Sequence, residues 1–193
     1  MSDLSLQLQQ AQAQLPVTSY FDEALFQREL ETIFQSGPRY VGHQLAVPEL
    51  GDYFALPQES EGRVLVRTQN GVELLSNVCR HRQAIILKNR GSLQNQAQSS
   101  GAGNIVCPLH RWTYSPSGEL LGAPHFAQDP CLNLKNYPMQ EWNGLLFEDN
   151  GLDIAADLAN MGPRSALDFT GFALDRVELH ECNYNWKTFI EVY

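Results

Sequence analysis

The sequence has 193 residues, 43% of them hydrophobic, and a formal net charge of −9. This length allows one complete domain and part of a second, with a core of ordinary size. Nucleic-acid and anionic-membrane surfaces need clustered Lys and Arg, so the acidic balance argues against both and favours a small-molecule or protein partner. The N-terminus lacks a basic segment followed by an apolar stretch, and no apolar run has the length of a membrane span, so we expect a cytoplasmic location.

The N-terminal part contains two segments of different character. Residues 2–14 alternate Leu or Ala with Gln and offer little to bury, so we expect residues 1–18 to form a flexible leader. In residues 22–35 the apolar side chains recur at helical spacing, Ser19 or Asp22 can cap the start, and Gly37 followed by Pro38 ends the pattern. The sequence therefore predicts a helical segment at residues 19–39 that packs as a brace.

From residue 40 onward, short β-branched and aromatic runs alternate with Gly, Asp or Asn, which is typical of an antiparallel sheet. We expect strands at residues 40–41, 53–56, 64–66, 72–75, 104–106, 112–114, 137–141 and 145–148. Turns are expected at residues 115–118 and at Asn143-Gly144. Residues 91–104 are rich in Gly, Ser and Gln and contain one large apolar residue, so they predict an exposed loop.

The C-terminal part changes pattern again. After about Asp149 the composition becomes helical through residues 155–158, and Pro163 separates a tail in which residues 175–182 predict a strand. Residues 186–192 are typical of the opening of a helix, and the chain stops there, which a natural terminus seldom does. We therefore expect a piece of a longer protein.

Two short motifs each combine one cysteine with one histidine: Cys79-Arg80-His81 and Cys107-Pro108-Leu109-His110. In tight turns between short strands, they can bring two thiolates and two imidazoles to one small cofactor. Structural zinc also uses two cysteines and two histidines, but the usual zinc finger takes both cysteines from one motif and both histidines from the other. One of each per motif is the arrangement of a [2Fe–2S] cluster in which two cysteines hold one iron and two histidines the other. The spacing favours the iron–sulfur cluster, with zinc as the alternative.

Other potential ligands lie outside this pattern. The chain is neither short nor secretory in character, which favours metal binding over disulfide formation. We expect Cys131 and Cys182 to be small buried residues, as free cysteines usually are. His43, His125 and His180 are far apart in the sequence, and we expect each to have a structural role.

The residues around the two motifs resemble one family. Residues 77–82 and 107–114 are similar to the two cluster-binding loops in the large subunits of Rieske oxygenases, and the resemblance extends from Tyr40-Val41-Gly42-His43 to Asn185-Trp186-Lys187. It covers nearly everything after residue 19. Gln83 departs from the family, which often has glycine at this position. The 25 residues between the two motifs also exceed the family's customary spacing.

The resemblance implies a mainly β fold. It consists of a Rieske-type antiparallel β-sheet domain with a small cluster-binding subdomain at residues 40–160, preceded by the N-terminal helix. The truncated start of an α+β catalytic domain follows at residues 161–193.

The resemblance also implies an electron-transfer role. The cluster would pass electrons from a reductase or ferredoxin to a mononuclear iron in a neighbouring α subunit of a homotrimer, for hydroxylation or demethylation. That iron needs two histidines and one carboxylate, and the family's ligands lie beyond the Asn-Trp-Lys motif, so we expect them outside this chain. The alternative is a stand-alone Rieske-type ferredoxin, which needs neither the helix at residues 22–35 nor the segment after residue 160.

Side chains beside the four ligands are expected to adjust the site. Arg80 and Arg82 flank His81 and can offset the charge gained on reduction, while Trp112 is expected to shield the cluster from water. Two neutral imidazoles raise the reduction potential into a range of roughly −150 to +300 mV. Rieske proteins of respiratory complexes add a disulfide and a cluster-facing serine, where this sequence has Ala84, Leu109 and Trp112. With fewer hydrogen-bond donors, we predict a potential in the lower half of that range.

Overall fold

The computed structural model describes residues 15–95, 103–159, 161 and 167–192, and the chain divides into two compact units. Unit 1 combines Met1–Gly37 with His180–Tyr193, and unit 2 is Pro38–Leu179. The predicted leader lies outside the described residues except for its last four positions. Among the described residues, no helix combines the length and apolar character needed to cross a bilayer.

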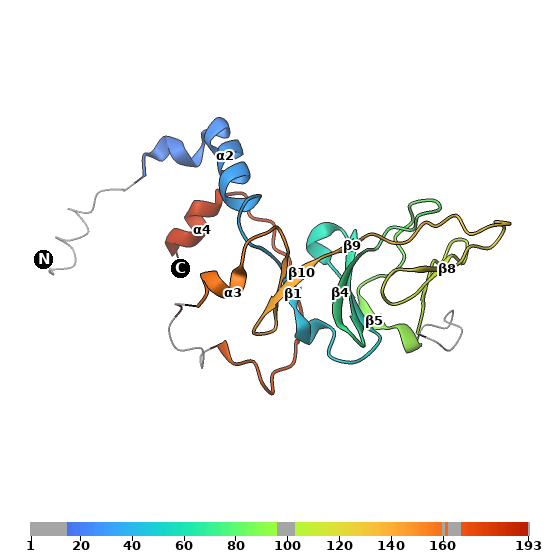
Figure 1. Cartoon of the computed structure of the whole chain (residues 1–193). Coiled ribbons are helices and arrows are strands. Elements are labelled where there is room, and N and C mark those ends of the chain that lie inside the picture. Colours follow the sequence, from blue (N-terminus) through green and yellow to red (C-terminus); the bar gives the residue numbers. More distant parts are fainter. Residues whose placement is uncertain (1–14, 96–102, 160, 162–166, 193) are drawn as a thin grey trace, which may run out of the picture. The chain divides into compact units, whose positions relative to one another are not determined.

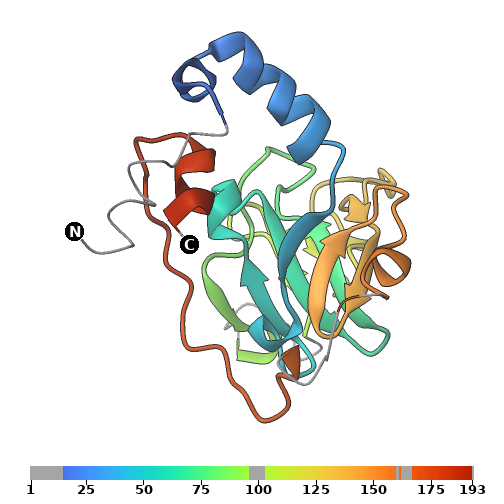
Figure 2. The same cartoon turned by 90° about the vertical axis from the view of Figure 1, so that its left-hand side faces the viewer.

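Unit 2 is built from three antiparallel sheets, which follow one another in Figure 1 with β1 and β10 at one end, β4 and β5 in the middle and β8 at the other end. The first sheet has the order β1-β11-β10, from strands Arg39–His43, Leu145–Glu148 and Met139–Trp142. The second has the order β5-β2-β3-β4-β9, from strands Arg90–Ser92, Asp52–Ala55, Arg63–Thr68, Gly71–Ser76 and Asn136–Tyr137. The third has the order β6-β7-β8, from strands Ile105–Val106, Thr113–Tyr114 and Leu120–Gly122. Figure 2 shows β1 beside the orange hairpin of β10 and β11.

The central sheet is buried on both faces. In β3, Val64 and Val66 point into one apolar cluster while Leu65 points into the other, as the two-residue period of a strand requires. The first of these clusters extends under the third sheet and includes Cys79 and Cys107. The cysteine motifs are therefore anchored in the main core of unit 2.

The predicted antiparallel sheet architecture is confirmed, except that one predicted strand is divided into two. Proline has no backbone N–H, and Pro138 separates the strand predicted at residues 137–141 into β9 and β10, which belong to different sheets. The turn at Asn143-Gly144 has the positive φ angles of 53° and 82° that its sequence predicts. The short helix expected near residues 155–158 is α3, Ile154–Asp157, with Asp153 capping its start.

Two predictions about irregular segments are wrong. Residues 91–104 do not begin as an exposed loop, because Arg90–Ser92 pairs with β2 and Leu93, in a short 3-10 helix at Leu93–Asn95, is fully buried. Residues 96–102 of that segment lie outside the described residues. No strand forms at residues 175–182 in the described part of the chain, because side-chain alternation gives a strand only where a neighbouring edge pairs with its backbone.

Unit 1 contains a short 3-10 helix at Val17–Tyr20 and two longer helices. The predicted N-terminal helix is confirmed as α2, Glu23–Glu29, which continues as a π-helical turn over Leu30–Phe34. Asp22 caps it, since its Oδ1 accepts hydrogen bonds from Ala24 N and Leu25 N at 2.9 and 3.2 Å. The predicted C-terminal helix is α4, Trp186–Val192.

Candidate functional site

The first cysteine motif lies in a tight loop that follows β4. Asn77 is fully buried at its base and bridges the two sides, because its Nδ2 donates to Leu87 O at 2.7 Å and its Oδ1 accepts from Leu87 N at 2.9 Å. Within the loop, Cys79 N donates to Ala84 O and Gln83 N donates to Cys79 O, both at 2.9 Å. The loop geometry is therefore fixed by the backbone and by one buried amide.

The second cysteine motif repeats this plan between β6 and β7. Cys107 N donates to Trp112 O at 2.8 Å, and Arg111 N donates to Cys107 O at 3.0 Å. The fourth residue after each cysteine, Gln83 or Arg111, has a positive φ of 56° or 62°. The family's frequent glycine at position 83 fits this backbone, and Gln83 adopts it at the modest steric cost of a non-glycine residue.

The two loops bring the two predicted histidine ligands together and place the two predicted cysteine ligands in one buried cluster. The rings of His81 and His110 lie 4.7 Å apart between centroids, at an interplanar angle of 72°. Cys79 and Cys107 are buried, free thiols with 2% and 1% exposure, whereas His110 is exposed. Burial raises the pKa of the Cys107 thiol, so a bound cation is needed to favour its thiolate.

These donors fit a two-iron cluster. Nδ1 of His81 is buried and has no hydrogen-bond partner among the described residues, as expected for a nitrogen that binds a metal. No set of three or more His, Cys, Asp or Glu side chains in that part of the chain is placed to hold a single ion. A [2Fe–2S] cluster does not need such a set, because each iron takes two protein ligands and two sulfides.

Two aromatic side chains enclose His81. The Trp112 ring is stacked on the His81 ring at 5.1 Å with an interplanar angle of 3°, and Trp112 is fully buried. Phe126 meets both rings edge-on, at 5.8 Å from His81 and 5.1 Å from Trp112. The burial of Trp112 supports the predicted shielding, and the clamp fixes the plane of the His81 ring.

Comparison with known proteins identifies the family. A model described as the Rieske [2Fe-2S] domain matches residues 38–138. The chain belongs to the Rieske [2Fe–2S] domain family. This assignment favours the iron–sulfur cluster over the zinc alternative.

The relatives of this Rieske chain are oxygenase α subunits. Over its whole length it is 60% identical to a putrescine 2-hydroxylase of Ralstonia nicotianae, of which it covers 51%. Over 82% of its length it is 28% identical to the benzene 1,2-dioxygenase α subunit of Pseudomonas putida, of which it covers 35%. The chain thus spans about half the length of the first relative, and these similarities argue against the alternative of a stand-alone ferredoxin.

The fold also matches a solved structure. A quaternary ammonium Rieske monooxygenase bound to an inhibitor superposes with a TM-score of 0.65, covering 92% of this chain and 50% of that one at 20% identity. At this identity the match shows the fold alone. It supports the mainly β Rieske architecture described above.

Tyr114 also belongs to the Rieske site, although the sequence motifs did not predict a role for it. Its hydroxyl lies 3.5 Å from Cys79 Sγ and accepts a hydrogen bond from Arg80 N at 3.2 Å. Burial raises the pKa of Tyr114, so the hydroxyl remains protonated and able to donate. The available signal was the strand period, because Trp112 and Tyr114 are two residues apart and face the same side.

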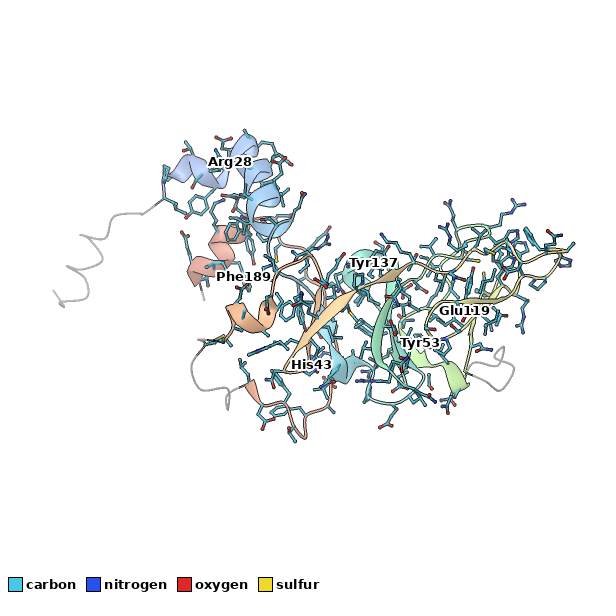
Figure 3. All side chains as sticks on the ribbon, viewed as in Figure 1. Arg28, His43, Tyr53, Glu119, Tyr137 and Phe189 are labelled. Carbon is cyan, nitrogen blue, oxygen red and sulfur yellow. The ribbon has the colours of Figure 1, made fainter. Side chains whose placement is uncertain are left out.

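Arg80 and Arg82, which flank His81, are both exposed, as a role in offsetting charge at the surface requires. The three remaining histidines lie in different places. His43, labelled in Figure 3, ends β1, where its Nδ1 accepts from Leu45 N and burial lowers its pKa. His125 is exposed, and the pKa of His81 is lowered first by burial and then by neighbouring charges, of which His125 is one. His180 lies exposed in unit 1.

The prediction that Cys131 and Cys182 are buried is wrong. Both side chains are exposed. Cys131 has a φ of 54° and its amide donates to Asp129 Oδ1 at 2.8 Å, in an irregular loop outside the strands. Cys182 follows the segment that does not form a strand. The general burial of cysteine therefore does not extend to these irregular segments.

Proposed function

We propose that this chain is the electron-transfer part of a Rieske oxygenase α subunit, in which Cys79 and Cys107 hold one iron and His81 and His110 hold the other. The observation that supports this most directly is the convergence of two backbone-fixed loops on a buried, unpartnered His81 Nδ1. When bound, the [2Fe–2S] cluster supplies reversible one-electron storage.

The surroundings of the four residues suit electron exit on one side. The two cysteines are sealed in the core, while His110 is exposed and His81 is partly exposed beside it. Electrons would come from a reductase or ferredoxin and leave toward a mononuclear iron outside this chain, in a neighbouring α subunit of a homotrimer. We place this protein in the cytoplasm.

For the whole protein we propose hydroxylation of a short aliphatic diamine. The support is the 60% identity to a putrescine 2-hydroxylase, against 28% identity to a ring-hydroxylating α subunit. Oxidation of an aromatic ring is the second candidate. The residues that recognise the substrate would lie beyond this chain, so the test requires the full-length protein.

The cluster assignment is tested by purifying the chain under air and measuring visible absorption, iron, acid-labile sulfide and the electron paramagnetic resonance of the dithionite-reduced sample. We expect about two irons and two sulfides per chain, with the spectrum of a mixed-ligand cluster. Cys79→Ser or His110→Ala should abolish it, while Cys131→Ser, at an exposed cysteine, should not. Colourless protein containing stoichiometric zinc would contradict the proposal.

The substrate proposal is tested with full-length protein, a reducing system and ¹⁸O₂. Mass spectrometry should find one labelled oxygen atom in putrescine and none in benzene. Labelled benzene diol without labelled putrescine would favour the second candidate instead.

A further inference from the structure

Three buried side-chain nitrogens have no hydrogen-bond partner in the part of the chain that the structure describes: His43 Nε2, His81 Nδ1 and Trp112 Nε1. Buried polar groups are nearly always paired, and an unpaired one costs free energy, so each needs a physical reason. His43, labelled in Figure 3, lies at the end of β1 beside the turn at Gly144. The other two nitrogens belong to the Rieske site.

The two nitrogens of the site need different partners. His81 Nδ1 can bind iron through its lone pair, as proposed above. The indole nitrogen of Trp112 carries a hydrogen and can only donate, so it needs an acceptor atom. Trp112 is fully buried, and bulk water therefore cannot supply that acceptor.

Trp112 is attached to both cysteine motifs. Its carbonyl oxygen accepts a hydrogen bond from Cys107 N at 2.8 Å, which ties its backbone to the second motif. Its ring is stacked on the ring of His81, from the first motif, with 5.1 Å between centroids and an interplanar angle of 3°. The two unpaired nitrogens thus belong to parallel, stacked rings at the place where the motifs meet.

A cluster held at this place would offer suitable acceptors. Sulfide and thiolate sulfurs carry negative charge and accept hydrogen bonds, and such bonds help to set the reduction potential of iron–sulfur clusters. The competing acceptor is the ring face of Phe126, whose centroid lies 5.1 Å from that of Trp112 at 87°. An N–H···π contact of that kind is weaker than a hydrogen bond to a charged sulfur.

We propose that the indole N–H of Trp112 donates a hydrogen bond to a sulfur of the bound [2Fe–2S] cluster. Such a bond stabilises the reduced cluster, because the added electron makes its sulfurs more negative. Trp112 then does more than shield the site, and it contributes a donor beside His81 as Tyr114 does beside Cys79. This inference rests on the proposed function, because it needs the cluster to be present.

The hydrogen bond can be detected directly by pulsed electron paramagnetic resonance. The chain has three tryptophans, and it is produced with [indole-¹⁵N]tryptophan, loaded with its cluster and reduced with dithionite. Hyperfine sublevel correlation should show an isotropic ¹⁵N coupling, because a hydrogen bond transfers spin density from sulfur to nitrogen. Trp112→Phe should remove the coupling, whereas Trp142→Phe, at a residue of similar burial in β10, should retain it. Loaded native protein without this coupling would overturn the proposal and assign the N–H to Phe126.

An isosteric replacement separates the hydrogen bond from shielding. β-(3-Benzothienyl)alanine keeps the shape of tryptophan but has sulfur in place of the N–H. Replacing all three tryptophans should lower the equilibrium constant for cluster reduction by about fivefold, as loss of one hydrogen bond does. At 59 mV per tenfold change this is roughly 40 mV in a redox titration.

The control for this replacement is the Trp112→Phe chain. There the same amino acid replaces only Trp142 and Trp186, and the potential should not change. An unchanged potential in the fully replaced native chain would mean that Trp112 only shields the cluster, and an equal fall in both chains would mean that another tryptophan is responsible. Either result, on loaded protein, would overturn this proposal alone. Colourless protein in every sample would instead contradict the proposed function.

Discussion

Tyr114 is the residue through which the protein can adjust the cluster's reduction potential most directly. A hydroxyl that donates to a cysteine sulfur stabilises the reduced, more negative cluster, and Tyr114 Oη lies 3.5 Å from Cys79 Sγ. We predict that Tyr114→Phe retains the cluster but lowers its potential. One hydrogen bond of about 1 kcal/mol corresponds to roughly 40 mV for a one-electron couple. A redox titration followed by visible absorption measures the change.

The matched control for Tyr114 is Tyr53→Phe. Tyr53 also carries a hydroxyl in unit 2, but that hydroxyl lies against Gly91, where β2 pairs with β5. Its removal should leave the potential unchanged. An unchanged potential in Tyr114→Phe would mean that the hydroxyl does not donate to the sulfur.

At this scale the sequence predicted the ligands but not their environment. One cysteine and one histidine in each motif, at Cys79, His81, Cys107 and His110, is the ligand pattern of a [2Fe–2S] cluster, and it fits few other metal sites. The strand period can place Tyr114 on the same side as Trp112, but the contact of Tyr114 with Cys79 spans 35 residues of sequence and cannot be read from a local pattern. Tyr114 therefore adds one hydrogen-bond donor to the few that were expected near the cluster. The reduction potential predicted for the cluster, in the lower half of the Rieske range, stays a prediction.

Among the elements, the turn between β10 and β11 gives a sharp test of packing. Gly144 has a φ of +82°, and a Cβ there would lie 2.6 Å from His43 Cε1 at the end of β1. We predict that Gly144→Ala destabilises unit 2 because backbone strain adds to this collision, by about 1–3 kcal/mol beyond the strain itself. Gly151→Ala is the control, since Gly151 has a φ of +89° and open space around it. The difference between the unfolding free energies of the two variants, measured in urea, gives the cost of the collision. Equal losses of unfolding free energy in both variants would contradict the predicted collision.

The loop at residues 91–104 shows where composition misleads. Its Gly, Ser and Gln content predicts an exposed segment, yet Leu93 is fully buried in the same apolar cluster as Cys79. We predict that Leu93→Ala costs about 2–5 kcal/mol of unfolding free energy, the usual range for a buried leucine. Leu121→Ala, at 53% exposure, should cost much less. Similar urea midpoints for the two variants would mean that Leu93 is not part of the core.

Strands were predicted correctly where the same stretch of sequence contains both the side-chain pattern of a strand and the neighbouring strand that pairs with it. The strands at residues 64–66 and 72–75 form a hairpin, so local sequence supplies both the pattern and the pairing. Residues 175–182 have the alternation of a strand without a paired edge, and β5 has the pairing without the alternation. Pairing between distant segments depends on the tertiary structure. For this reason the predictions for residues 175–182 and for β5 were both wrong.

At the scale of the whole molecule, unit 1 joins segments that are more than 150 residues apart in the sequence. Lys187 in α4 is only 7% exposed, and its Nζ donates to both carboxylate oxygens of Glu29 in α2 at 2.7 Å. Trp186 Nε1 donates to the same carboxylate at 2.9 Å. The Asn-Trp-Lys motif, visible in the sequence only as a resemblance, therefore anchors the two helices of unit 1 to each other.

Removing the Glu29 charge should loosen unit 1 and leave unit 2 intact. Glu29→Gln leaves the buried Lys187 ammonium without its counterion, so we predict faster amide hydrogen exchange in α2 and α4, measured by mass spectrometry, and unchanged exchange in β3 and β4. Glu31→Gln, an exposed acid of the same helix, should have little effect.

Acid should reduce the effect of Glu29→Gln. Hydrogen bonds from Lys187 and then Trp186 hold the pKa of Glu29 below its usual value. Its stabilisation is therefore complete above the pKa of the unfolded chain, about 4.3, and is lost as the pH falls through the lower folded value. The difference in Tm between the native chain and Glu29→Gln, followed by circular dichroism at 222 nm, should shrink below roughly pH 4. A difference that persists in acid, or faster exchange in β3, would show that Glu29 acts by some means other than its pairing with Lys187.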